Sequence, residues 1–232
     1  MKIEIWSDVI CPFCYIGKAN LEQALAQTGA EADIVHRAFR LSPGEPVTPT
    51  DQMLQRKYGM NAQQVSANLA QVTATAANAG LEFHLSGTLA GDTTDAHRLI
   101  ALAAGKGKQA EAVTALYRAY FTDGRNIFDR ATLHAIGAGL GLTAADIDAA
   151  FTSSEIDMQI ALDQRQAQAI GVRGVPFVVV DGKYAVSGAQ PVAAFVQTLQ
   201  AAAAEAAKNP VIEGDACGVG GCDPAQSASQ KV

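Results

Sequence analysis

The chain has 232 residues, enough for one sizeable domain or two small ones that share a core; 49% of the residues are hydrophobic and 17% are charged. This composition is typical of a globular protein and excludes a disordered chain. The net charge is −6 and the Lys and Arg residues are scattered, so we do not expect nucleic acid as a partner. No apolar run reaches the length of about 18 residues that a membrane span needs, so we expect no membrane partner either.

The start of the chain bears on its location. Met1 and Lys2 lead directly into a β-branched run, without the apolar stretch of a secretory signal. We therefore expect a cytoplasmic protein, unless a signal has already been removed. The four cysteines form two close pairs, Cys11 with Cys14 and Cys217 with Cys222. Two close pairs indicate redox or metal chemistry, because the disulfide framework of a small secreted domain would space its cysteines differently.

The first cysteine pair lies where a predicted strand passes into a predicted helix. Residues 2–10 begin as a β-branched run with period-two alternation, and an apolar pattern of helical period begins at Ile16. Pro12 suits the first helical position, because its φ is already helical and its missing N–H would have no partner there. The sulfur of Cys11 is therefore expected at the positive end of a helix.

This position predicts the chemistry of the pair. A free thiol titrates at about 8.5, and a helix N-terminus or a Cys-x-x-Cys pairing lowers that pKa. We expect Cys11 to be largely thiolate, the species that attacks disulfides. Cys14 follows one helical turn later, where it could resolve the mixed disulfide. The alternatives are an inert buried thiol pair or half of a metal site.

The remaining elements follow in chain order. The first helix is predicted to run to about residue 26 and is followed by a strand at 32–39; a crossover of this length implies a parallel pair. Prolines and a glycine make residues 41–49 a loop. Helices are then predicted at 50–58, 61–79, 92–104, 109–121, 130–139, 143–151 and 155–170. Residues 171–188 contain two strands joined by an Asp-Gly turn, and a last helix covers 191–208.

This order predicts an α/β protein with a thioredoxin fold and an inserted α-helical domain. Residues 1–49 and 171–208 would form a discontinuous thioredoxin-like domain. Residues 50–170 would form the inserted helical domain. Residues 209–232, with a Cys-x4-Cys pair among several glycines, would form a flexible C-terminal tail.

Four motifs in this order resemble the FrnE-type branch of the DsbA-like thiol oxidoreductases, and the resemblance extends from residue 1 to about residue 207. They are Ser7-Asp8-Val9-Ile10-Cys11-Pro12-Phe13-Cys14-Tyr15-Ile16-Gly17-Lys18, Asp95-Ala96-His97-Arg98-Leu99, Gly174-Val175-Pro176-Phe177 and Ser187-Gly188-Ala189-Gln190. The resemblance implies that Cys11 is the nucleophile and Cys14 the resolving cysteine. It also implies that the Val175–Pro176 bond is cis.

The same resemblance predicts how a substrate is held. The loop at Val175 would offer its backbone groups to an extended peptide, beside Pro12 and Phe13. His97 is placed near this groove, as a substrate contact or as a residue of a helix surface without chemistry. Asp8 is the nearest carboxylate in sequence; it either relays the proton of Cys14 or makes local hydrogen bonds at the end of its strand.

Phe13 is a departure from the family pattern. DsbA has a histidine between its cysteines, which helps to stabilise the thiolate and makes the protein a strong oxidant. Phe13 can supply neither a hydrogen bond nor a charge there. We therefore expect a less oxidising pair that suits isomerase or reductase work in the cytoplasm.

The second cysteine pair has three candidate uses. Four residues, three of them glycines, separate Cys217 from Cys222, so a turn could bring the sulfurs within disulfide reach. The pair could exchange electrons with Cys11 and Cys14 as a relay, form an independent disulfide, or bind metal. Similar tails occur in FrnE-like proteins.

Together these features predict a thiol-disulfide oxidoreductase that acts on protein or peptide disulfides, with glutathione or a thioredoxin-type protein as a candidate reductant. No organic cofactor and no metal is expected, since the cysteines carry the electrons. One alternative is a glutathione-dependent enzyme, either a kappa-type transferase or a hydroxychromene-carboxylate-type isomerase, although those proteins generally carry serine in place of Cys11. Another is a zinc-binding or chaperone-like protein.

Overall fold

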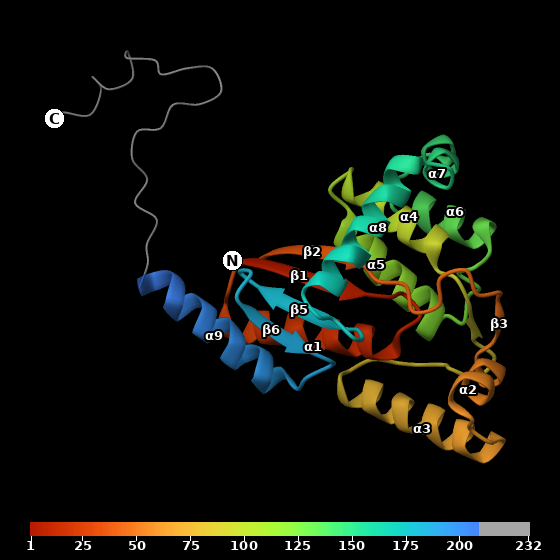
Figure 1. Cartoon of the computed structure of the whole chain (residues 1–232), viewed down its shortest axis with the longest axis horizontal. Helices are drawn as coiled ribbons and strands as arrows, with labels where there is room; N and C mark the ends of the chain where they lie inside the picture. The colour runs from red at the N-terminus through yellow and green to blue at the C-terminus, as the bar shows by residue number, and fades with distance from the viewer. Residues whose placement is uncertain (209–232) are drawn as a thin grey trace, which may run out of the picture.

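A four-stranded sheet forms the centre of the computed structural model, which describes residues 1–208 (Figure 1). The strand order is β2-β1-β5-β6. The strands are β1 (Lys2–Ser7), β2 (Asp33–Ala38), β5 (Phe177–Val180) and β6 (Tyr184–Ser187). β1 pairs in parallel with β2 and antiparallel with β5, and β5 pairs antiparallel with β6. The predicted parallel pair and hairpin are therefore confirmed.

The two faces of the sheet are covered by different helices. Alternate residues of β1 and β5, including Ile3, Ile5 and Val178, pack with Leu21 of α1 (Pro12–Thr28) and Phe195 of α9 (Val192–Lys208). On the opposite face, Trp6 packs against Ala167, near the end of α8 (Ser154–Ala169), and against Val172, which follows this helix. The Trp6 indole N–H donates to the Asp163 carbonyl of α8 at 2.9 Å. This double coverage fits the near-continuous apolar sequence of β5.

The remaining helices follow β2 in the chain, and all but the first of them contribute buried residues to a second apolar cluster that includes Cys11 and Cys14. They are α2 (Thr50–Tyr58), α3 (Ala62–Asn78), α4 (Thr94–Ala104), α5 (Gln109–Tyr117), α6 (Arg130–Gly139) and α7 (Ala144–Ala150), with a π-helical turn η1 (Arg118–Thr122) directly after α5. The predicted helices are all present. A capping box starts α3, in which the Asn61 side chain accepts from the Gln64 backbone N–H and the Gln64 side chain accepts from the Asn61 backbone N–H.

Two features differ from the sequence prediction. A pair of two-residue strands, β3 (Thr48–Pro49) and β4 (Leu89–Ala90), joins the loop before α2 to the chain before α4. Elements this short carry no periodic pattern, so they are not predictable from it. The predicted helix at 109–121 also changes its hydrogen-bond spacing at Arg118, and helical periodicity does not distinguish such a turn from an α-helix.

Side chains of the helices cover the outer edge of β2. The Gln109 amide accepts from the His36 backbone N–H and donates to the His36 carbonyl, both at 2.9 Å. At the end of the same strand, a carboxylate oxygen of Asp163 accepts from the Ala38 N–H at 3.0 Å. These bonds take the place of a neighbouring strand at an otherwise open edge.

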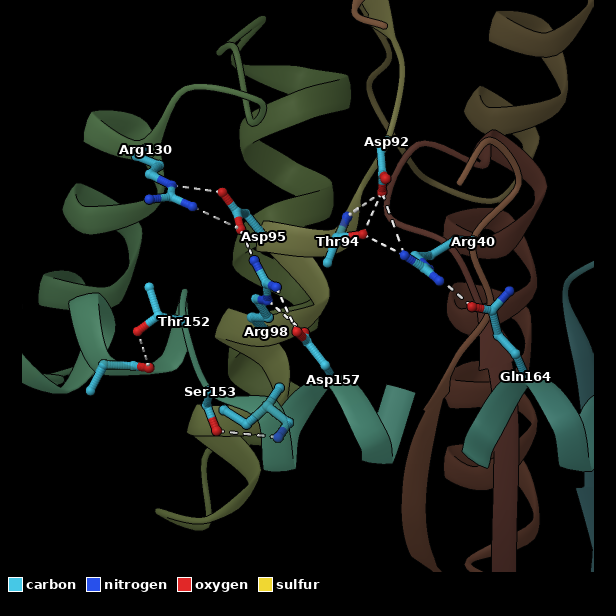
Figure 2. Close-up of polar contacts among 12 residues, drawn as sticks. Arg40, Asp92, Thr94, Asp95, Arg98, Arg130, Thr152, Ser153, Asp157 and Gln164 are labelled. Atoms are coloured by element: carbon cyan, nitrogen blue, oxygen red, sulfur yellow. Dashed lines mark hydrogen bonds and ion pairs between the residues drawn. The ribbon is translucent and has the colours of Figure 1, made fainter. Parts of the chain in front are cut away.

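Ion pairs connect the helices to one another (Figure 2). Arg98 of α4 donates two hydrogen bonds of 2.8 Å to the Asp157 carboxylate of α8 and one of 2.7 Å to Asp95. Asp95 in turn accepts from Arg130 of α6. Arg40, beyond β2, donates to Gln164 of α8. The network therefore joins three helices and fastens the end of β2 to one of them.

The structure confirms the predicted α/β thioredoxin fold in which helices follow the β-α-β unit and precede the hairpin. The division into a domain of residues 1–49 and 171–208 and a domain of residues 50–170 stays a prediction. Residues 209–232, with Cys217 and Cys222, lie outside the described residues. Within residues 1–208, no helix is long and apolar enough to cross a membrane.

Candidate active site

The first cysteine pair lies at the N-terminus of α1. Cys11 is the N-cap residue with an extended backbone, and Pro12 occupies the first helical position. The Cys11 N–H donates to the Asp8 carbonyl at 3.1 Å, and the Cys14 N–H donates to the Cys11 carbonyl at 3.0 Å. Both cysteines are free thiols and both are buried, 5% and 1% exposed. The backbone thus holds the two sulfurs one turn apart at the positive end of the helix.

The loop before β5 lies against Cys11. The Cys11 thiol donates to the Val175 carbonyl at 3.6 Å, and the Val175–Pro176 bond is cis, as the resemblance implies. The Pro176 carbonyl accepts from the Gly188 N–H at 2.8 Å, which fixes the loop to the end of β6. Gly17 leaves the room that this approach needs, since a Cβ there would lie 3.0 Å from Pro176 Cγ.

Cys14 differs from Cys11 in its surroundings. Burial raises the pKa of the Cys14 thiol well above its usual value, and the hydrogen bond and charge of Cys11 raise it further. The Asp8 backbone N–H lowers this pKa in part, whereas the charge of the Asp8 carboxylate raises it. Cys14 is therefore a protonated thiol in the dithiol state at neutral pH.

Asp8 and His97 form a buried pair behind the cysteines. Asp8 is fully buried and His97 is 4% exposed. Asp8 Oδ1 lies 3.4 Å from His97 Nε2, and within residues 1–208 neither atom has a hydrogen-bond partner. The other carboxylate oxygen of Asp8 accepts from the Leu41 N–H at 2.7 Å, so the carboxylate also anchors the segment after β2.

Aromatic rings pack on the helical side of the cysteines. Tyr15 of α1 stacks on Tyr117 with ring centroids 4.9 Å apart, and Phe83 stacks on Phe121 at 4.6 Å. Burial raises the pKa of the Tyr117 hydroxyl well above its usual value. These rings belong to the apolar cluster that buries Cys11 and Cys14, and they join α1 to α5 and η1.

The structure therefore brings together most of the residues that the sequence singles out. Cys11, Cys14, Val175 and Pro176 meet at one point, with Pro12 and Phe13 on the turn itself. Phe13 is 43% exposed. His97 lies inside the molecule against Asp8, so its contact with a substrate stays a prediction that its burial does not favour.

A metal site is a further alternative from the sequence. Across the described chain, no three His, Cys, Asp or Glu side chains gather closely enough to hold a metal ion. A zinc site that also uses Cys217 and Cys222 would involve residues outside the described part.

A Cys-x-x-Cys pair at a helix N-terminus beside a cis-proline, on a sheet of this order, is the arrangement of a thioredoxin-fold thiol-disulfide oxidoreductase. The chain belongs to the DSBA-like thioredoxin domain family, which it matches over residues 2–200. This protein is a DsbA-like oxidoreductase.

Three similar proteins illustrate the relationship. A crystal structure of a probable DsbA oxidoreductase from Streptomyces coelicolor is 39% identical, with a TM-score of 0.87 over 96% of this chain and 98% of that one. The cytosolic disulfide reductase DsbM from Pseudomonas aeruginosa has the same fold, with 18% identity and a TM-score of 0.61 over 90% and 98% of the two chains. The uncharacterized protein YwbO of Bacillus subtilis is 25% identical over 78% of this chain and 86% of its own.

Proposed function

We propose that the protein exchanges disulfides with protein or peptide substrates by cycling Cys11 and Cys14 between dithiol and disulfide. The observation that carries this proposal is the position of the Cys11 thiol, at the N-terminus of α1 and 3.6 Å from the Val175 carbonyl of the cis-proline loop. A substrate sulfur that reacts with Cys11 would lie beside the Val175 backbone of that loop. An extended peptide could then pair with Val175 as a strand pairs with an edge.

The reductive direction proceeds in two displacements. The Cys11 thiolate attacks one sulfur of the substrate disulfide, forms a mixed disulfide and releases the other sulfur as a thiolate, which takes a proton from water. Cys14 then loses its proton and attacks Cys11, which releases the second substrate thiolate and leaves a Cys11–Cys14 disulfide. Two electrons pass to the substrate, and an external thiol must return them.

One observation supports the reductase or isomerase direction. Phe13 offers neither hydrogen bond nor charge to a Cys11 thiolate, so this residue does not stabilise the reduced form of the pair. This is consistent with work in the cytoplasm, which keeps thiols reduced. Glutathione is a candidate reductant, and a structure of DsbM with glutathione is among those that share this fold. A thioredoxin-type protein is the other candidate.

We also propose the Cys217–Cys222 pair as an electron relay. α9 starts beside the Pro176 loop, where the Gln190 carbonyl accepts from the Asn20 side chain, and its 17 residues lead away from there over about 25 Å. Cys217 follows Lys208 by nine residues, which span about 30 Å at full extension. Cys217 would therefore reach Cys11 of the same chain only through a nearly extended segment, whereas Cys222, 14 residues beyond Lys208, has a longer reach. Exchange between two copies is the second route.

The deciding experiment equilibrates the protein with glutathione buffers and locates each disulfide by mass spectrometry. We expect Cys11 and Cys14 to titrate as one two-electron pair, Cys14→Ser to accumulate a mixed disulfide at Cys11, and Cys11→Ser to lose exchange activity. A Cys11–Cys14 disulfide that never forms reversibly would refute the function. Isomerase activity that survives Cys11→Ser would favour the glutathione-dependent class, and about one zinc per chain after reducing purification would favour the zinc-binding class.

The relay is tested in the same buffers with a double variant, Cys217→Ser with Cys222→Ser. We expect the rate at which the Cys11–Cys14 disulfide is reduced to fall, while its equilibrium potential stays unchanged. A rate equal to that of the wild type would exclude the relay. A rate that rises with protein concentration would assign the exchange to two copies.

A further inference from the structure

A cavity of about 370 Å³ is lined in part by Cys11, the residue that carries the reactive sulfur. One wall is the active-site turn, including Cys11 and Phe13, and the opposite wall is formed by α2 and α3. The volume lies in the range of ligand pockets, about 300 to 1,000 Å³. The cavity is separate from the Val175 loop, which does not line it. Cys11 therefore lies between the Val175 loop on one side and this cavity on the other.

The wall of this cavity is apolar and incompletely covered. α2 has no buried residue, although Met53 and Leu54 face the cavity from it. At the mouth, Tyr58 is 60% exposed and Phe13 is 43% exposed. Large apolar side chains that remain exposed together indicate a site that another molecule covers. The methionine on α2 adds an adaptable side chain that can fit different apolar groups.

The cavity also has a defined charge. Of the described residues that line it, Lys57 is the one that carries a formal charge, and none is acidic. Lys57 is exposed, and its ammonium group donates to the Leu41 carbonyl at the weak distance of 3.5 Å. A positive rim disfavours a basic substrate and favours an acidic one.

Two of the residues that line the cavity lie in the π-helical turn η1. Tyr120 and Phe121 belong to this turn, are buried and line the cavity. The Tyr120 hydroxyl donates to the Leu89 carbonyl of β4. Turns of this kind often occur at functional sites because they redirect side chains that a regular helix would place elsewhere.

We propose that this cavity selects substrates: it takes a large apolar side chain, such as that of Phe, Leu or Met, from the residue next to the substrate cysteine. The inference rests on the proposed function, because the side chain enters while the substrate sulfur is bonded to Cys11. The substrate backbone lies along Val175 and the neighbouring side chain turns into the pocket. Lys57 at the rim adds a preference for an acidic residue beyond it.

The test uses short symmetrical peptide disulfides that carry Phe or Ser next to cysteine, on either side, and Phe peptides that are extended by Glu or Lys. The full chain in its reduced form is mixed with each peptide, and quenched samples give kcat/KM from the released peptide thiol. We expect kcat/KM for the Phe peptide to exceed that for the Ser peptide at least about tenfold. One methylene more or less in an apolar pocket already changes kcat/KM by about 10- to 200-fold. For peptides with Glu or Lys added beyond Phe, we expect the Glu peptide to react faster.

Two variants and one control assign the preference to the cavity. Leu69→Trp, from α3, narrows the cavity and should abolish the Phe-over-Ser ratio. Lys57→Glu changes an exposed residue whose hydrogen bond to the Leu41 carbonyl is weak, and it should reverse the Glu-over-Lys preference. Leu162→Trp makes the same change at an exposed site of α8 away from the cavity and should keep both ratios.

The outcomes separate the two proposals. If the Phe and Ser peptides react equally fast in the wild type, the cavity does not select substrates, while the disulfide exchange stands. If no peptide reacts, the proposed function itself fails. A mixed disulfide of benzyl thiol and glutathione that reacts as fast as the Phe peptide would assign the cavity to small apolar thiols and overturn the peptide assignment.

Discussion

His36 makes the stability of the protein dependent on pH. The side chain lies on β2, is 7% exposed, and its Nδ1 has no hydrogen-bond partner within the described residues. Burial lowers the pKa of His36 from 6.5 to about 4, and the nearby positive charge of Lys18 contributes to this. The folded protein thus holds this imidazole neutral at a pH where the unfolded chain has already protonated it.

The sign and size of the effect follow from this pKa. Because the unfolded chain binds the extra proton first, the stabilisation is complete above about pH 6.5 and is lost as the pH falls toward about 4. Each pH unit inside this window costs about 1.4 kcal/mol, so the full window costs about 3 kcal/mol. That is a large part of the 5 to 15 kcal/mol that typically stabilises a domain, as an order of magnitude.

The assay is urea unfolding at pH 7, 6, 5 and 4 for the wild type and His36→Gln. The free energy of unfolding of the wild type should fall by about 3 kcal/mol more than that of the variant over this range. Lys18→Met removes the second cause, so the folded pKa of His36 should rise; the loss should still begin near pH 6.5 but should end at a higher pH and be smaller. Parallel curves for the wild type and His36→Gln would refute the reasoning, because the loss would then come from other groups.

Three further predictions concern the site and its support. Phe13→His should make the Cys11–Cys14 pair more oxidising in glutathione buffers, since an imidazole can stabilise the Cys11 thiolate; an unchanged potential would contradict this. Asp8→Asn, in a Cys11→Ser background, should lower the pKa of Cys14 because it removes the carboxylate charge that raises this pKa. The rate of Cys14 alkylation measured against pH would record the change. An equal or higher pKa would show that this charge does not act on Cys14. Arg98→Leu should cost about 1 to 2 kcal/mol in the free energy of unfolding, measured in urea, because α4 loses its paired hydrogen bonds to Asp157 (Figure 2); no loss would mean that water replaces them at no cost.

Local signals made most of the fold predictable. Period-two alternation at Ile3 and Ile5, the proline after Cys11, the capping residues at Asn61 and the Asp181-Gly182 turn each act over a few neighbouring residues. The order of these elements then limits the topology, because parallel neighbours must be joined by a long crossover and a tight turn can join only antiparallel strands. The bounds of most helices consequently differ from the prediction by only a few residues.

The active site was predictable only where its residues lie together in one short segment of the sequence. The Cys11-Pro12-Phe13-Cys14 turn is visible in the sequence, and the resemblance implies the Val175–Pro176 loop. The pairing of Asp8 with His97 and the cavity between the turn and α2 depend on how distant segments pack. A buried histidine and an exposed one have the same sequence signal, so the position of His97 required the structure.

The side chains along β2 have a consequence for misfolding. Gln109 and Asp163 occupy hydrogen-bonding positions that a strand from another molecule would need. Both belong to helices, so a fluctuation that detaches α5 and α8 while the sheet stays intact would open this edge. Aggregation of the protein would then begin from a partly unfolded state with a native sheet, and its rate would follow the local opening of these helices rather than global unfolding.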